Sequence, residues 1–439
     1  MTFPEMFLSI DIVEGPVIIT FFALSAIAAT YLLYRRRAKG WALICLIAVA
    51  TGLVGAGLIW FFTVRVWNLF GVGLGMTTYL WLAAVCVGVC VAVATLWKSS
   101  RTRTAIAAAS VLLFLVTGAL GINASFGLNR TVGSLLGMSA EPILHLTPPS
   151  TASGQKTIGP TLPLWQTWTS PADMPETGTT GTQVIPPTLS GFSSRPAGIY
   201  LPPAALVAKP PKLPLVILLM GQPGNPDPSF IAATLDREAA THHGLAPIVI
   251  VADQLGSPTD DPLCLDTPRF GNAETFIAQD VVNWAKANLN ILPDSAHWTI
   301  AGYSNGGQCA VSLAAKYPHL WSNLIDISGE EFPGSEIEAA TLHDVFNGNQ
   351  TAYDAQKPVN LLAAHPLPNT VGVFTVGSND TGFIPGVHRV SAAAEAAGMK
   401  VTYWESPNGG HVLPALTDGL DKAFEVLYPR LGLASDAPG

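Results

Sequence analysis

The stretch Trp298-Thr299-Ile300-Ala301-Gly302-Tyr303-Ser304-Asn305-Gly306-Gly307 decides the fold of this 439-residue chain. An apolar segment suited to a strand leads into Gly-x-Ser-x-Gly, and residues 308–317 continue at helical spacing. A strand, a tight turn that carries a serine, and a helix together form the context of a nucleophile elbow. Small residues at 302 and 306 allow the strand and the helix to approach closely. The pattern therefore predicts that the Ser304 hydroxyl projects from the edge of a sheet.

Composition divides the chain into two parts. The whole chain has a net charge of −8 and only 12% charged residues, about half the usual share for a soluble domain. Residues 1–122 contain 8 Lys or Arg and 3 Asp or Glu, whereas residues 123–439 contain 14 and 27. Because phosphate binding needs a basic face, the acidic second part argues against nucleic acid as a partner.

Four apolar segments in the first part each approach the ~20 residues that cross a bilayer. They lie at Pro16–Tyr34, Trp41–Val64, Leu74–Trp97 and Ala105–Ile122. An ion or proton pathway would usually need an ionisable side chain inside these segments, and their interiors carry none. The sequence predicts a four-helix transmembrane region over residues 1–122 that anchors the chain in the cytoplasmic membrane.

The short loops between these segments indicate the orientation of the chain. Basic residues gather in the loop after the first segment and in the loop after the third: Arg35, Arg36, Arg37 and Lys39, then Lys98, Arg101 and Arg103. Since basic loops stay in the cytoplasm, both loops are expected there. The N-terminus and everything after Ile122 are then expected on the extracytoplasmic side.

Residues 123–190 are rich in Pro, Thr, Ser and Gly, a composition typical of a linker. From 191 to 439, short apolar segments alternate with segments of helical period. The expected strands lie near residues 198–201, 215–220, 247–253, 298–302, 323–328, 371–376 and 401–404. This alternation predicts one α/β domain, a mostly parallel sheet with helices on both faces.

A reactive serine needs a base and an acid that orients the base. Asp380 lies in the loop after the expected strand 371–376, and His411 follows the strand 401–404 behind Gly409 and Gly410. Active sites gather at such strand ends in open α/β sheets. We therefore expect a catalytic triad of Ser304, Asp380 and His411. Asp344 and Asp354 remain alternative acids, and the other histidines are interpreted as linker, surface or capping residues.

The loop from Leu219 to Gly224 follows an early strand, where hydrolases of this kind place an oxyanion hole. The backbone N–H groups of Gln222 and Asn305 are the expected donors. Cys264 and Cys309 belong to the part expected in an oxidising compartment, so they either form a disulfide or remain two thiols. No Cys/His spacing fits a metal site, and no cofactor is expected.

Taken together, these motifs resemble the putative-esterase family of α/β-hydrolases, which includes esterase D, enterochelin esterases and secreted mycolyltransferases. The resemblance covers about residues 192–430. It rests on Arg195-Pro196-Ala197-Gly198-Ile199-Tyr200-Leu201-Pro202, Glu274-Thr275-Phe276, Gly302-Tyr303-Ser304-Asn305-Gly306-Gly307, Tyr317-Pro318 and Gly409-Gly410-His411. The mycolyltransferases use a glutamate as the acid and an apolar residue in place of Gln222, so this chain departs from them at two positions. The four N-terminal helices lie outside the resemblance.

The resemblance implies an α/β-hydrolase fold and a metal-free serine esterase or acyltransferase. The first hypothesis is a membrane-anchored esterase that hydrolyses a small-molecule or lipid-linked acyl ester through an acyl-enzyme. The second is an acyltransferase that passes the acyl group to a sugar or lipid hydroxyl. A non-catalytic scaffold or partner-binding domain is the third. Protein partners are not indicated by the sequence.

Overall fold

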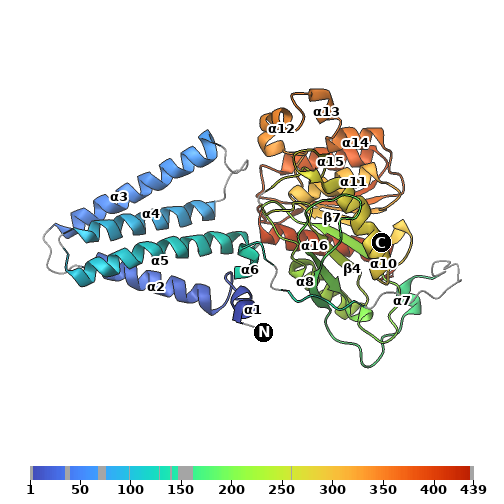
Figure 1. Ribbon diagram of the computed structural model, residues 1–439, viewed down its shortest axis with the longest axis horizontal. Coiled ribbons are helices and arrows are strands. Elements are labelled where there is room, and N and C mark those ends of the chain that lie inside the picture. Colours follow the sequence, from blue (N-terminus) through green and yellow to red (C-terminus); the bar gives the residue numbers. More distant parts are fainter. Residues whose placement is uncertain are drawn as a thin grey trace. The chain divides into compact units, whose positions relative to one another are not determined.

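The structure is a computed structural model of the chain. It describes residues 3–34, 40–67, 76–97, 99–127, 129–138, 141–146, 162–258 and 260–435. The chain divides into two compact units, Met1–Ala140 and Glu141–Gly439. Figure 1 labels helices and strands of both units.

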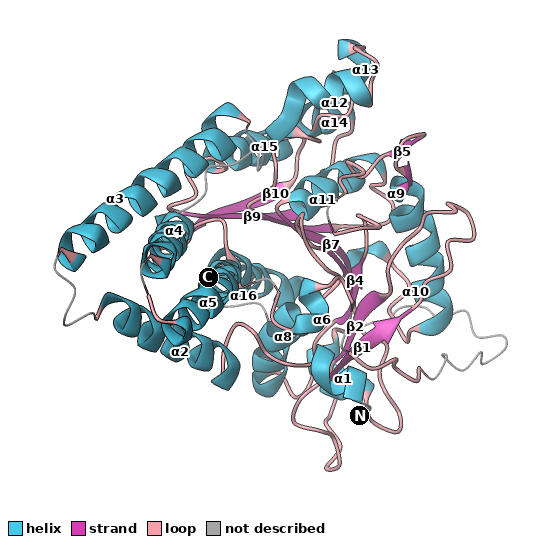
Figure 2. Ribbon diagram, turned by 60° about the vertical axis from the view of Figure 1, so that its left-hand side comes forward, coloured by secondary structure: helices cyan, strands magenta, loops and turns pink. Residues whose placement is uncertain are grey.

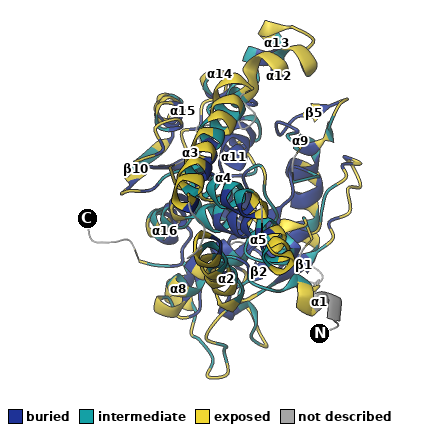
Figure 3. Ribbon diagram, turned by 90° about the vertical axis from the view of Figure 1, so that its left-hand side faces the viewer, coloured by how far each residue is buried: buried dark blue, intermediate teal, exposed yellow. Residues whose placement is uncertain are grey.

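The first unit is a bundle of helices. Its helices are α1 (Phe3–Leu8), α2 (Pro16–Leu33), α3 (Trp41–Trp60, continued by a π-helical segment Phe61–Val66), α4 (Met76–Leu96), α5 (Arg101–Phe126) and α6 (Val132–Leu135). The four long helices, including the π-helical extension of α3, are long and apolar enough to cross a membrane. Helix α4 packs between α3 and α5, and α2 packs on α5. Figure 3 shows exposed residues along α2 and α3, many of which are large apolar side chains.

Arg103 joins the end of α2 to the start of α5. Its guanidinium donates hydrogen bonds to the carbonyls of Tyr31 and Leu32, at 3.1 and 2.8 Å. The last carbonyls of a helix have no hydrogen-bond partner inside the helix. The Arg103 side chain supplies donors to two of them, which a hydrocarbon environment could not do. The helix ends that flank the two basic loops therefore lie at the same end of this unit.

The second unit is built on an eight-stranded sheet with the order β1-β2-β4-β3-β7-β8-β9-β10. Strands β4, β3, β7, β8, β9 and β10 run parallel, and β1 and β2 are antiparallel additions at one edge. The strands are β1 (Thr179–Gln183), β2 (Ala197–Leu201), β3 (Leu215–Leu219), β4 (Ile248–Ala252), β7 (Trp298–Tyr303), β8 (Asn323–Ile327), β9 (Val371–Gly377) and β10 (Lys400–Ser406), with a separate hairpin of β5 (Asp266–Thr267) and β6 (Gly271–Asn272). The prediction of a mostly parallel sheet is confirmed.

Helices cover both faces of this sheet. They are α7 (Leu164–Thr167), α8 (Ser229–Thr241), α9 (Ala273–Thr275), α10 (Val282–Asn288), α11 (Asn305–Lys316), α12 (Glu338–Asp344), α13 (Gln350–Asp354), α14 (Pro358–Ala364), α15 (Ile384–Ala396) and α16 (Leu413–Arg430). Figure 2 shows α11 and α15 on one side of the sheet and α8 and α16 on the other. Every residue of β3, β4 and β7 is buried, as continuous apolar strands require.

The structure corrects the linker expected over residues 123–190. Helix α5 continues to Phe126, and β1 (Thr179–Gln183) pairs with β2 as the edge strand of the sheet. The second unit thus begins at Glu141, before the expected boundary at residue 191. Composition hid this strand because threonine is common in linkers but also, being β-branched, favours strands. Residues 147–161 of the expected linker lie outside the described residues.

Candidate active site

Ser304 occupies a strained turn between β7 and α11. Its backbone has φ 56° and ψ −119°, a region that side chains other than glycine rarely adopt. A Cβ atom on Gly302 would lie 1.8 Å from the carbonyl oxygen of Gly306, and one on Gly306 would lie 2.0 Å from the carbonyl oxygen of Leu219. Both positions therefore require glycine. The close approach turns the serine side chain out of the sheet, as the sequence pattern predicts.

The structure brings Ser304, His411 and Asp380 together in one hydrogen-bonded chain. The imidazole Nε2 of His411 lies 2.8 Å from the Ser304 Oγ, and its Nδ1 lies 2.7 Å from the Asp380 Oδ2. Ser304 and Asp380 are buried, whereas 23% of the His411 side chain is exposed. An imidazole with these two neighbours can accept the serine proton while the carboxylate holds it in one orientation.

The loops that carry the acid and the base are fastened to each other. After β9, the backbone N–H of Asn379 donates to the Gly409 carbonyl at 2.7 Å, and that of Ser378 donates to Ser406 at 2.9 Å. The imidazole itself is stacked on two rings, with centroid distances of 3.9 Å to Phe383 and 5.4 Å to Tyr303. These contacts limit rotation of the base away from Ser304.

The alternative acids lie elsewhere and have other partners. Asp344 pairs with Arg269 at 2.9 Å, and Asp354 pairs with Lys357 at 2.9 Å. Both carboxylates belong to the exposed helices α12 and α13. Neither is brought to the imidazole that Asp380 contacts.

The predicted oxyanion donors flank the serine. A Cβ atom on Gly221 would lie 3.1 Å from the Ser304 Cβ, so the loop that contains Gln222 runs directly beside Ser304. Asn305 is the first residue of α11, where backbone N–H groups have no partner inside the helix and favour negative charge. Their role as donors to a tetrahedral oxyanion remains a prediction.

Two residues at the end of β4 hold these donors in place, and sequence reasoning missed both. The buried Gln254 donates from Nε2 to the Met220 carbonyl and to the Asn305 Oδ1, the latter at 3.3 Å. Asp253 forms an ion pair with Arg195 at 2.6 Å, and Arg195 in turn donates to the carbonyl of Gly224 at 2.9 Å. One strand end thus braces both sides of the expected oxyanion hole. The available signal was Asp-Gln directly after a wholly apolar strand.

Two acidic residues that the sequence did not single out, Asp261 and Glu330, contact Asn305, and a third, Glu336, lies near both of them. The Asn305 amide donates to Asp261 at 2.9 Å and also hydrogen-bonds to Glu330. Burial raises the pKa of Glu330 well above its usual range, and the nearby Asp261 and Glu336 carboxylates raise it further. Burial also raises the pKa of Asp261, and raises the pKa of Glu336 to about 7. Each proton held by one of these carboxyl groups removes a negative charge from the surroundings of the expected oxyanion hole.

Cys264 and Cys309 form a disulfide. Cys309 lies in α11, one turn after the elbow, and Cys264 lies in the loop that also carries Asp261. The bond therefore fixes an otherwise irregular loop against the helix that follows Ser304.

The sheet and its elbow define the class of the second unit, an α/β-hydrolase. Residues 193–401 match the family model described as "Putative esterase". The matched range includes Ser304 and Asp380 and ends ten residues before His411. An uncharacterized protein of Corynebacterium glutamicum is 30% identical over 349 residues, 77% of this chain and 79% of that protein. The chain belongs to the putative-esterase family and is a hydrolase.

Solved structures with a similar fold include an S-formylglutathione hydrolase from Agrobacterium tumefaciens. It is 18% identical, and the match covers 58% of this chain and 97% of that chain, with a TM-score of 0.49. A ferulic acid esterase is also 18% identical, over 56% of this chain and 96% of that chain, with a TM-score of 0.45.

The brace by Gln254 predicts a specific catalytic defect. In Gln254→Ala, kcat on a soluble p-nitrophenyl ester should fall by about 10- to 100-fold, with KM little changed. The reason is that loosened oxyanion donors act in the transition state and not in substrate binding. Gln308→Ala is the matched control, because Gln308 is equally buried in α11 but bonds to Ser312 instead. Equal losses of kcat in both variants would show that Gln254 is only a packing residue.

The raised pKa of Glu330 predicts how stability depends on pH. The folded state favours the protonated form of Glu330, and the resulting contribution to the free energy of unfolding is complete below about pH 4, the pKa of an unfolded glutamate. The contribution is lost as pH rises toward the raised folded pKa, by about 1.4 kcal/mol per pH unit. Glu330→Gln should therefore match the wild type near pH 4 and have a larger free energy of unfolding at pH 8, in denaturant titrations of the full chain in detergent. Glu425→Gln, at a carboxylate that is 68% exposed, should show no such gain. A gain of equal size at both pH values would contradict the assignment.

Proposed function

We propose that the chain is a membrane-anchored serine esterase that hydrolyses an acyl ester, small or lipid-linked, on the extracytoplasmic side of the cytoplasmic membrane. The observation that carries the proposal is the His411 imidazole, hydrogen-bonded to Ser304 at 2.8 Å and to Asp380 at 2.7 Å. The esterase family of the chain supports the same chemistry.

In this mechanism, Nε2 of His411 takes the proton from Ser304 as the serine oxygen attacks the ester carbonyl carbon. Asp380 holds the imidazole orientation and balances the charge of the imidazolium. The tetrahedral oxyanion lies between the backbone N–H groups of Gln222 and Asn305. The imidazolium then gives its proton to the departing alcohol, and the acyl group remains bonded to Ser304 as an acyl-serine.

Water resolves the acyl-serine by the reverse sequence of proton transfers. Hydrolysis is favoured over transfer because 23% of the His411 side chain is exposed, so water reaches the base without displacing protein. Transfer to a sugar or lipid hydroxyl uses the same residues and differs only in the molecule that His411 activates.

The membrane location is supported by the four long apolar helices of the first unit. The side of the membrane is supported by two separate features. The basic loops flank helix ends that lie together, which favours a cytoplasmic position for both loops. The Cys264–Cys309 disulfide in the second unit is typical of an oxidising compartment.

Labelling with a fluorophosphonate probe tests the catalytic proposal. The wild type and Ser312→Ala should react with the probe, whereas Ser304→Ala should lose labelling and about 10⁴-fold or more of its esterase activity. Ser312 is a matched control because it is a buried serine in α11, the helix that follows Ser304. In the wild type, free acid should remain the main product even with an acceptor alcohol present. Labelling that survives Ser304→Ala would overturn the assignment of the nucleophile.

Accessibility of single cysteines tests the orientation. In a background without Cys45, Cys86 and Cys90, Arg130→Cys should react with a membrane-impermeant maleimide on intact cells, and Arg37→Cys should not. The reason is that residue 37 lies in a basic loop and residue 130 follows the fourth helix. The opposite pattern would place the catalytic unit in the cytoplasm.

A further inference from the structure

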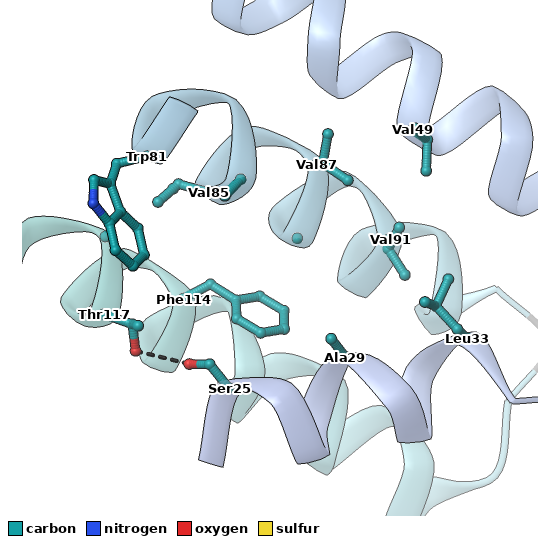
Figure 4. Close-up of a pocket in the computed structure, with 13 residues that line it drawn as sticks. Ser25, Ala29, Leu33, Val49, Trp81, Val85, Val87, Val91, Phe114 and Thr117 are labelled. Atoms are coloured by element: carbon teal, nitrogen blue, oxygen red, sulfur yellow. Dashed lines mark hydrogen bonds between the residues drawn. The ribbon is translucent and has the colours of Figure 1, made fainter. Parts of the chain in front are cut away.

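The four long helices of the first unit line a partly open apolar cavity of about 340 Å³, within the size range of ligand pockets. Figure 4 shows side chains from α2, α3, α4 and α5 around it, among them Ala29, Val49, Val91 and Phe114. Leu33 and Ala84 also line the cavity and are exposed. The cavity therefore opens to the outer surface of the bundle.

The lining offers almost nothing to a polar ligand. The Ser25 and Thr117 hydroxyls are hydrogen-bonded to each other at 2.7 Å, as Figure 4 shows. The Trp81 indole at one end stacks on Phe22 with ring centroids 5.1 Å apart. A polar ligand would lose its hydrogen bonds with water and gain few in return. Water itself does not fill apolar cavities of this kind.

The cavity is long, and its length matches a hydrocarbon chain. Its lining runs from Trp81 to Val91 along α4 and from Ser25 to Leu33 along α2. At 1.5 Å per residue these spans are about 15 and 12 Å. The longer span is about half of the ~30 Å hydrocarbon core, the depth of one leaflet. A helix, about 10 Å in diameter, would not enter such a space without separating the bundle.

We propose that this cavity binds one acyl chain of a membrane lipid. The surroundings of an inserted bundle are hydrocarbon, so a chain can enter from the outer surface of the bundle without crossing water. Bound there, it makes the dispersion contacts that the lining lacks when the space is empty. The first unit then recognises lipid in addition to anchoring the chain. The proposal rests on the membrane insertion argued above, and not on the triad.

Photocrosslinking tests this site in the full chain. The protein is placed in phosphatidylcholine vesicles that contain phosphatidylcholine with a diazirine on one acyl chain, and labelled residues are mapped by mass spectrometry. In the wild type we expect label on Val85 and Phe114, which line the cavity, as well as on the exposed Leu112 and Leu115. Ala29→Phe fills the cavity and should lower label at Val85 and Phe114 by about tenfold, with label at Leu112 unchanged.

Ala26→Phe is the matched control, because Ala26 is an exposed residue of the same helix that does not line the cavity. It should keep the wild-type pattern. Val49→Phe fills the cavity from α3 and should repeat the loss, which separates filling from damage to α2. Unchanged label at Val85 and Phe114 in both filled variants would overturn the site. Label on Leu112 and Leu115 alone in the wild type would also overturn it, although insertion would stand. No label anywhere would overturn both the site and the membrane location.

Discussion

The catalytic half of the structure depends on the left-handed backbone of Ser304. That conformation exists only because Gly302 and Gly306 let the start of α11 pack against the ends of β7 and β3, with no room for a Cβ atom. The same contact places the loop after β3 beside the serine. The position of the proposed nucleophile and one side of the expected oxyanion hole are thus consequences of one packing constraint.

Asn305 is the point at which several separate segments meet. Its side chain contacts Gln254 from the end of β4, Asp261 from the disulfide-held loop, and Glu330 from the loop after β8. The residue that follows the nucleophile is therefore fixed from three directions. Such support matters because oxyanion donors stabilise a transition state only if they are already in place when charge develops.

The sequence predicted the features that local pattern encodes. The elbow, the parallel strands, and the loops that carry Asp380 and His411 all follow from residues close together in the chain. The contacts that support the expected oxyanion hole do not follow from local pattern. Arg195 pairs with Asp253, and Gln254 hydrogen-bonds to Asn305, and each pair is more than fifty positions apart in the sequence. No periodicity specifies such contacts, and only the folded sheet brings them together. Strand β1 was missed for another reason, because its threonine-rich sequence has a linker-like composition.

Charge explains why an esterase of this kind would need helices to work on a lipid-linked ester. The second unit, residues 141–439, carries 27 acidic and 13 basic side chains, a balance that anionic lipid headgroups would repel. Under the proposed function, its association with a bilayer would therefore come from apolar burial by the four helices of the first unit that are long and apolar enough to cross a membrane. Covalent attachment also converts the encounter with a membrane-borne ester into an event at high effective concentration. For such a tethered enzyme, the acidic surface would influence which headgroups the catalytic unit tolerates, and not whether enzyme and substrate meet.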